Sequence, residues 1–169
     1  MLKEKCGVVG IYSNSGADVS PSIFYGLYAL QHRGQESCGI TIYDAEFHTE
    51  KGMGLVPEFF NLKKLGKLKG SRGIGHVRYS TTGESKIECA QPLVVTHSKG
   101  TLAIAHNGNI INAMDLKKRL ENAGQAFVST TDTEVIAHLI VRQLVKGEDI
   151  VSATTEVMKK LIGSYSLVL

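Results

Sequence analysis

Cys6 stands first among the residues that could carry chemistry, because a cysteine thiol is intrinsically nucleophilic. Its unperturbed pKa of about 8.5 means that a nearby base must take the proton. If residues 1–5 are a leader peptide that is removed, Cys6 gains a free α-amine with a pKa of about 7.7–8.0. Such an amine could accept the thiol proton and return it to a leaving amine. On position alone, however, a cysteine in an apolar run is typical of an inert core thiol.

Three further segments carry polar residues near the ends of predicted elements. Arg78 lies at the end of a predicted strand and precedes small hydroxyl residues. Asn107 and Gly108 follow another predicted strand, where a turn could point the Asn107 side-chain amide and the Gly108 N–H at one oxygen, as an oxyanion hole does. Asp132 lies in the first turn of a predicted helix. Taken singly, each has a plainer interpretation: a surface cation, a turn by composition, and an acid that favours the helix dipole.

Hydrophobic periodicity and Gly, Pro and Asn breaks predict the elements that must position these residues. Strands are expected at 6–12, 38–43, 46–52, 73–79, 92–97 and 101–106, with a last strand-like run at 165–169. Helices are expected at 21–32, from Asn112 to Gly124, from a capping box of Thr131 and Glu134 to Leu144, and at 148–161, with short helical pieces over 57–69. This order indicates a mixed α+β fold with sheets layered between helices, and not repeated βαβ units.

The composition bounds the class of protein. The 169 residues are 43% hydrophobic and 21% charged, which suits one domain with its own core and argues against a disordered chain. No apolar run approaches the roughly 18–20 residues of a membrane helix, and no signal peptide is visible, so we expect no membrane partner and a cytoplasmic location. A net charge of +3 is too mild to indicate a nucleic-acid partner.

The remaining cysteines, histidines and lysines predict no second site. An odd count of three cysteines argues against a disulfide framework, and Cys38 and Cys89 are expected to be structural. The six histidines lack short ligand spacings, so no metal site is expected, and His76 and His106 are expected to hold hydrogen bonds in the sheet. The basic cluster over 63–72 is interpreted as a solvated helix face, although it could hold an acidic partner.

Five segments occur in a specific order along the chain: Cys-Gly-Val-Val-Gly-Ile (6–11), Leu-Gln-His-Arg-Gly-Gln-Glu (30–36), Gly-Ile-Gly-His-Val-Arg-Tyr-Ser-Thr (73–81), Ala-His-Asn-Gly-Asn-Ile (105–110) and Thr-Asp-Thr-Glu (131–134). Together they resemble the glutaminase domain of amidophosphoribosyltransferases, which are class II glutamine amidotransferases of the N-terminal-nucleophile hydrolase superfamily. The resemblance runs from Cys6 to Leu169. The form of the second segment favours this family over asparagine synthetase and glucosamine-phosphate synthase relatives.

This resemblance implies a four-layer αββα sandwich and a role for each matching residue. Cys6 would attack the side-chain amide carbon of glutamine, and Asn107 with Gly108 would form the oxyanion hole. Arg78 would bind the substrate α-carboxylate, a task that suits a bidentate guanidinium, and Asp132 would accept the α-ammonium group. The remaining matches to the glutamine pocket are Tyr79, Thr81, Arg33 and Gly34.

The resemblance also implies parts that lie outside this chain. We expect residues 1–5 to be a leader and residues 6–169 to be a partial glutaminase domain, truncated at its C-terminal end and without its phosphoribosyltransferase domain, so that the fragment alone could be inactive. In the full protein, ammonia would convert phosphoribosyl pyrophosphate to phosphoribosylamine in purine biosynthesis, and a homo-oligomer is expected. No cofactor is expected within this chain; Mg and an iron–sulfur cluster would belong to the missing part. The alternatives are another N-terminal-nucleophile amidase and a non-catalytic binding module.

Overall fold

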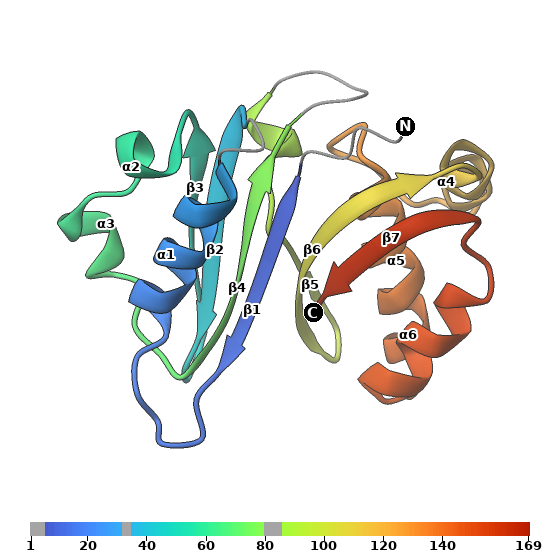
Figure 1. The fold of residues 1–169 in the computed structure, drawn as a ribbon. Helices are drawn as coiled ribbons and strands as arrows, with labels where there is room; N and C mark the ends of the chain where they lie inside the picture. The colour runs from blue at the N-terminus through green and yellow to red at the C-terminus, as the bar shows by residue number, and fades with distance from the viewer. Residues whose placement is uncertain (1–5, 32–34, 80–85) are drawn as a thin grey trace.

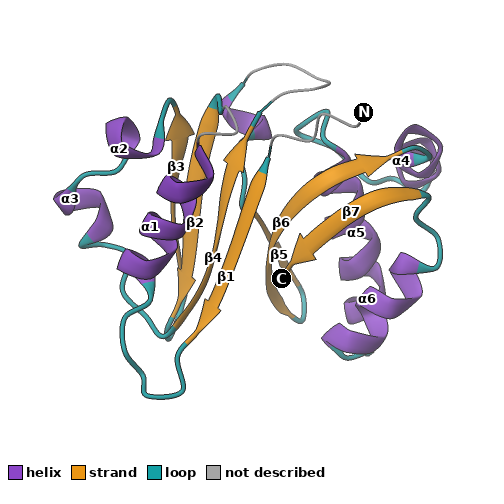
Figure 2. Cartoon of the chain, viewed as in Figure 1, coloured by secondary structure: helices purple, strands orange, loops and turns teal. Residues whose placement is uncertain are grey.

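The computed structural model describes residues 6–31, 35–79 and 86–169. Two antiparallel sheets face each other, and helices cover both outer faces (Figure 1). Figure 2 shows the same succession of helix, sheet, sheet and helix by element type. The predicted α+β fold with four αββα layers is therefore confirmed. No described helix combines the length and the apolar character needed to span a bilayer.

The first sheet has the strand order β1-β4-β2-β3. Its strands are β1 (Gly7–Tyr12), β2 (Ser37–Tyr43), β3 (Phe47–Met53) and β4 (Arg72–Arg78). Helix α1 (Ser20–Leu30) packs on the outer face, since Ile23 and Leu27 recur at helical spacing and are fully buried. Gly75 of β4 makes room for them, because a Cβ there would lie 2.6 Å from Ile23 and 2.9 Å from Leu27. Two short helices, α2 (Val56–Phe59) and α3 (Leu62–Leu65), lie on the same side of this sheet (Figure 1).

The second sheet has the strand order β5-β6-β7, with β6 in the middle. Its strands are β5 (Leu93–His97), β6 (Gly100–Ile110) and β7 (Gly163–Val168), and a 3₁₀ helix, η2 (Ile87–Cys89), precedes β5. The outer face is covered by α4 (Ala113–Asn122), α5 (Asp132–Val145) and α6 (Ile150–Met158). Leu102 and Ile104 of β6 share one buried core cluster with Ile136 and Ile140 of α5.

A third and smaller apolar cluster lies between the two sheets. Ile74 of β4 packs with Ala103 and Ala105 of β6, and Val8 of β1 packs against them. The small alanine side chains let the sheets approach, so this inner core contains less apolar volume than the two outer ones. Because side chains alternate along a strand, this cluster also identifies which residues of each strand face the gap between the sheets.

The turn predicted at Asn107 and Gly108 is wrong, because strand β6 continues through both residues to Ile110. They pair with Ser166 and Tyr165 of β7, and this pairing overrides the turn-like composition. Gly108 adopts φ +147°, a conformation that L side chains rarely adopt. The polar segment is therefore held on a central strand.

The capping box predicted at the start of α5 is also wrong. The Thr131 side chain makes no capping hydrogen bond. The Glu134 carboxylate instead accepts hydrogen bonds from the backbone N–H groups of Val128 (2.8 Å) and Ser129 (2.7 Å) and from the Ser129 hydroxyl (2.7 Å). These bonds lower the pKa of Glu134 although its burial acts in the opposite direction. Glu134 thus fixes the loop that leads into α5.

Candidate active site

Cys6 lies immediately before β1, beside the end of β4. The Tyr79 backbone N–H donates to the Cys6 sulfur at 3.4 Å, and the Tyr79 carbonyl oxygen accepts from the thiol at 3.5 Å. The β1–β4 register pairs Gly7 with Val77, so Cys6 stands opposite Arg78. Two residues that are 72 positions apart in sequence are therefore neighbours across one antiparallel pair.

Strand alternation places Cys6 and Arg78 on the inner side of their sheet. Val8 and Ile74 pack in the core between the sheets. Cys6 lies two residues before Val8 and Arg78 lies four residues after Ile74, so both share the inner face. Arg78 is only 6% exposed. Its Nη1 lies 3.7 Å from Glu36 Oε2, and its carbonyl oxygen accepts a 2.6 Å hydrogen bond from the Glu36 N–H. A buried guanidinium of this kind suits the recognition of a carboxylate.

Asn107 and Gly108 lie on β6 of the opposing sheet. Ala103 and Ala105 of β6 face the first sheet, so the Asn107 side chain, two residues further on, is directed to the same gap as Cys6. Gly108 could not be replaced without displacing β7, because a Cβ there would lie 2.3 Å from the Ser164 carbonyl oxygen. The close approach of β7 and the positive φ both require glycine at this position.

Asp132 lies at the start of α5, on the helix side of β6. Its Oδ2 accepts a hydrogen bond from the Ile110 N–H at 3.2 Å, and its Oδ1 lies 3.3 Å from His106 Nδ1. Burial raises the pKa of Asp132, but the hydrogen bonds from His106, Ile110 and Thr133 outweigh burial and leave that pKa below its usual value. Asp132 is therefore an ionised carboxylate that is fixed to the strand of Asn107 and Gly108.

His76 and His106 hold hydrogen bonds between elements, as the sequence predicts. The His76 Nε2–H donates to the His106 carbonyl oxygen at 2.9 Å and joins β4 to β6. Burial, partly offset by this hydrogen bond, lowers the pKa of His76 to about 3. His76 is therefore neutral at physiological pH. Gln91 also belongs to this network, since its side-chain oxygen accepts from the His106 N–H at 2.7 Å. Its role is not predictable from the sequence, because an isolated glutamine between two elements has no pattern that marks it.

Three of the predicted substrate-binding residues, Arg33, Gly34 and Thr81, lie outside the described residues, as does the predicted leader at 1–5. Tyr79 is described and contributes its backbone to the contact with Cys6. Within residues 6–31, 35–79 and 86–169, no group of three or more His, Cys, Asp or Glu side chains is arranged to hold a metal ion.

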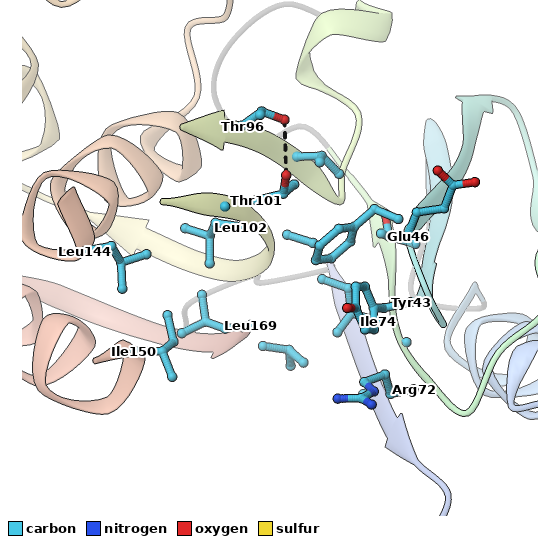
Figure 3. A pocket seen from close by; sticks show the side chains of 18 of the residues that line it. Tyr43, Glu46, Arg72, Ile74, Thr96, Thr101, Leu102, Leu144, Ile150 and Leu169 are labelled. Carbon is cyan, nitrogen blue, oxygen red and sulfur yellow. Dashed lines mark hydrogen bonds between the residues drawn. The ribbon is translucent and has the colours of Figure 1, made fainter. Parts of the chain in front are cut away.

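A groove lies at the opposite end of the gap between the sheets. It has a volume of about 1340 Å³ and opens between the end of β1 and the start of β6. Its walls include Tyr43 and Arg72 from the first sheet, Leu102 from the second sheet, and Leu169, which follows β7 (Figure 3). None of Cys6, Arg78, Asn107 and Asp132 lines this groove, so it is separate from the candidate active site.

Comparison with known proteins identifies the family of the chain. A family model described as "Glutamine amidotransferase domain" matches residues 76–169, more than half of the chain. The amidophosphoribosyltransferase of Methanothermobacter thermautotrophicus is 53% identical over 169 residues, and that of Methanocaldococcus jannaschii is 50% identical over 165 residues. The matches cover 99% and 97% of this chain but 36% and 35% of those relatives, so the chain spans about a third of their length.

Solved structures give the same result for the fold. The glutamine phosphoribosylpyrophosphate amidotransferase from B. subtilis, complexed with ADP and GMP, superposes with a TM-score of 0.83 at 42% identity. A structure titled as the allosteric regulatory enzyme of purine biosynthesis superposes with a TM-score of 0.85 at 41% identity. Each match covers 95% of this chain and 34% of the solved chain. The chain therefore belongs to the glutamine amidotransferase domain family and corresponds to the glutamine amidotransferase portion of amidophosphoribosyltransferases.

Proposed function

We propose that this chain hydrolyses the side-chain amide of glutamine, with Cys6 as the nucleophile. One observation carries the proposal: in the β1–β4 pairing Cys6 stands opposite the buried Arg78 on the inner side of one sheet, and strand alternation directs Asn107 of the other sheet toward the same gap. A nucleophile, a cation and an amide donor are thereby brought to one end of the sandwich. The family membership of the chain supports the same chemistry.

The reaction proceeds through a thioester. After removal of residues 1–5, the Cys6 α-amine takes the proton from the thiol, and the sulfur attacks the amide carbon of glutamine. The negative charge that develops on the amide oxygen is stabilised by the Asn107 side-chain N–H and the Gly108 backbone N–H. The α-amine then gives its proton to the leaving nitrogen, and ammonia departs. Water attacks the thioester carbon, the carbon–sulfur bond breaks, and glutamate and the thiol are released.

The substrate is selected by its two opposite charges. Arg78 binds the α-carboxylate of glutamine through its planar guanidinium, and Asp132 accepts hydrogen bonds from the α-ammonium group. Arg33, Gly34, Tyr79 and Thr81 complete the pocket in this proposal. A substrate with the amide but without the amino-acid end would leave both charged groups unpaired, which is costly in a site shielded from water.

In the complete protein, the ammonia would pass to a phosphoribosyltransferase domain and form phosphoribosylamine from phosphoribosyl pyrophosphate. This step rests on the relatives' names and on their length, about three times that of this chain. The boundaries of the leader at 1–5 and of a partial domain at 6–169 remain predictions, as do a cytoplasmic location, a homo-oligomer and a Mg or iron–sulfur requirement of the remaining part.

The test measures the intact mass of the purified protein together with glutamate release. Glutamate release should appear only when the mass shows loss of residues 1–5, because an amide nitrogen on Cys6 cannot serve as the base. Cys6→Ala should abolish the release. Activity in an unprocessed sample, or in Cys6→Ala, would refute the mechanism.

Cys38→Ala and Cys89→Ala serve as matched controls, and both should retain glutamate release. Both thiols are buried, and burial raises the pKa of Cys38 to about 12, so that thiol stays protonated and unreactive. Parallel assays with acylated amides that lack the α-carboxylate distinguish glutamine hydrolysis from the activity of another amidase. Faster hydrolysis of those amides than of glutamine would assign the chain to the second class.

A further inference from the structure

His106 lies where four elements of the candidate site meet. Its backbone N–H donates to the Gln91 side chain at 2.7 Å, and its carbonyl oxygen accepts from His76 Nε2 at 2.9 Å. Its ring Nδ1 lies 3.3 Å from both Asp132 Oδ1 and Thr133 Oγ1. One residue, 2% exposed, thus joins β4, the segment before β5, and α5 to strand β6.

The contacts of His106 divide into two groups that lead to different parts of the site. Its backbone contacts hold the strand position next to Asn107 and Gly108. The β5–β6 pairing ends at Leu93 and Ile104, so the Gln91 side chain supplies an acceptor that β5 no longer offers. The ring contact instead holds Asp132, which the Ile110 N–H fixes from its other side.

The hydrogen-bonding partners also define the protonation of both rings. Because a carbonyl oxygen only accepts, His76 carries its proton on Nε2. Because an ionised carboxylate only accepts, His106 carries a proton on Nδ1 toward Asp132. Neither His76 Nδ1 nor His106 Nε2 has a hydrogen-bond partner among the described residues, and both are buried. A second proton on the His76 ring would add an unpaired N–H in the interior, so this ring is most stable when neutral.

We propose that His106 is a positioning residue for glutamine hydrolysis: its ring orients Asp132 toward the substrate ammonium group, while His76 and Gln91 hold its backbone and thereby the oxyanion-hole segment. The proposal rests on the proposed function, since it assigns a purpose to Asp132, Asn107 and Gly108. It also separates two effects. Loss of the ring contact should weaken substrate binding, whereas loss of the backbone contacts should slow the chemical step.

His106→Ala tests the ring contact by steady-state glutamate release. A hydrogen bond to a charged group is worth enough that KM for glutamine should rise roughly tenfold or more, with kcat changed by less than about threefold. His106→Asn should restore most of the affinity, because the asparagine amide can place a donor where Nδ1 lies. His106→Gln reaches toward the position of Nε2 instead and should not restore it. Equal KM values for the Asn and Gln variants would overturn the ring assignment.

His76→Ala tests the contact of His76 with the His106 backbone, and here we expect kcat to change more than KM. We expect kcat to fall roughly tenfold while KM stays within about twofold, because the donor acts on the strand beside the oxyanion hole. Here His76→Gln is the conservative replacement, since its amide can reproduce the donor at Nε2, and His76→Asn is too short. His48→Ala, at an exposed position on β3, controls for the loss of a histidine and should behave as the unmodified chain. A fall in kcat that His76→Gln fails to reverse would overturn the backbone assignment.

A readout without turnover distinguishes a failure of this proposal from a failure of the proposed function. The amide N–H signal of Ile110, measured by NMR, reports the position of Asp132 because the two groups are hydrogen bonded. It should move in His106→Ala and stay close to its original position in His106→Asn. If the processed chain releases no glutamate, the proposed function fails, and the Ile110 signal alone decides the positioning role. An unchanged signal in His106→Ala would overturn that role whether or not glutamate is released.

Discussion

The two ends of the gap between the sheets are built in different ways. At the end where β1 begins, buried polar side chains bond from sheet to sheet, as between His76 and the His106 carbonyl. At the other end the sheets separate around a groove of about 1340 Å³, whose walls combine apolar and aromatic side chains with polar ones such as Thr96, Thr101 and Arg72. The His76 bond therefore links the two sheets at the active end, beyond the apolar cluster of Ile74, Ala103 and Ala105 that packs them together.

The largest expected difference between the two ends involves the arginines at the two ends of β4, Arg78 and Arg72. Arg78→Ala should raise KM for glutamine roughly 100-fold, because a buried charge-assisted contact to the α-carboxylate is lost. Arg78→Lys should recover only part of the affinity, since an ammonium group cannot bind a carboxylate in a bidentate manner. Arg72→Ala, at the groove end of the same strand, should leave KM unchanged. Similar KM values for the Arg78 and Arg72 variants would remove the distinction between the ends.

Two glycines with positive φ give the next largest contrast. Gly108→Ala should lower the free energy of unfolding by about 3 kcal/mol or more, because strain at φ +147° adds to a clash with β7. Gly100→Ala has a similar φ of +144° but open space around the added Cβ, so about 1 kcal/mol is expected. Urea unfolding of the two variants provides the measurement. A larger loss for Gly100→Ala would show that the close approach of β7 is unimportant.

His76 should make the stability of the protein sensitive to acid. Burial holds its folded-state pKa at about 3, whereas the unfolded chain binds a proton near pH 6.5. Between these values the unfolded state binds more protons, so the free energy of unfolding falls as the pH falls from 6.5 toward 3, by up to about 1.4 kcal/mol per pH unit. His76→Gln should remove the contribution of close to one proton from this slope. The measurement is the free energy of unfolding in urea at pH 7 and at pH 5. The exposed His48 is the matched position, and an equal reduction in His48→Gln would argue against a special role for His76.

The smallest effect is expected at the groove. The Arg72 guanidinium carbon lies 5.0 Å from the centre of the Tyr43 ring and 5.8 Å from that of Tyr12. Such exposed cation–π contacts contribute about 0.5–1 kcal/mol, so Arg72→Ala should lower the free energy of unfolding by no more than this. Arg72→Lys, which keeps a cation near the rings, should lose less. A loss above that of Gly108→Ala would mean that the groove end is as rigidly built as the active end.

The sequence predicts the layers of this fold well, because the apolar residues of its strands and helices recur at the spacing of each element and mark the face that is buried. Ile23 and Leu27 of α1, at helical spacing, are buried as expected. The errors occur where tertiary contacts decide the local structure. Asn107 and Gly108 have a turn-like composition, but their partners on β7 are more than 50 residues away in sequence. No local pattern contains that information.

Prediction of the candidate site from sequence has the same limit, because it also depends on contacts between distant segments. Arg78 and Asp132 could be selected because motifs mark them, but their surroundings depend on which elements meet in space. Gln91 has no motif and is recognised only because the His106 N–H lies 2.7 Å away. Likewise, the predicted cap at Glu134 gives the correct residue and the wrong partner, since the loop at Ser129 folds back onto it. The sequence predicts helices and strands where apolar residues recur at a regular spacing. It does not predict contacts between segments that are far apart along the chain.

The two faces of strand β6 have different surroundings, the gap between the sheets on one side and the helix layer on the other. Asn107 is directed to the gap where glutamine is proposed to bind, whereas the ring of its neighbour His106 points to the helix layer and contacts α5. Through Asp132, the rear face of this strand acts on the affinity for glutamine, although no rear-face side chain other than Asp132 is proposed to contact the substrate. Natural or designed substitutions behind β6 therefore offer a way to adjust that affinity without changing the nucleophile or the oxyanion hole.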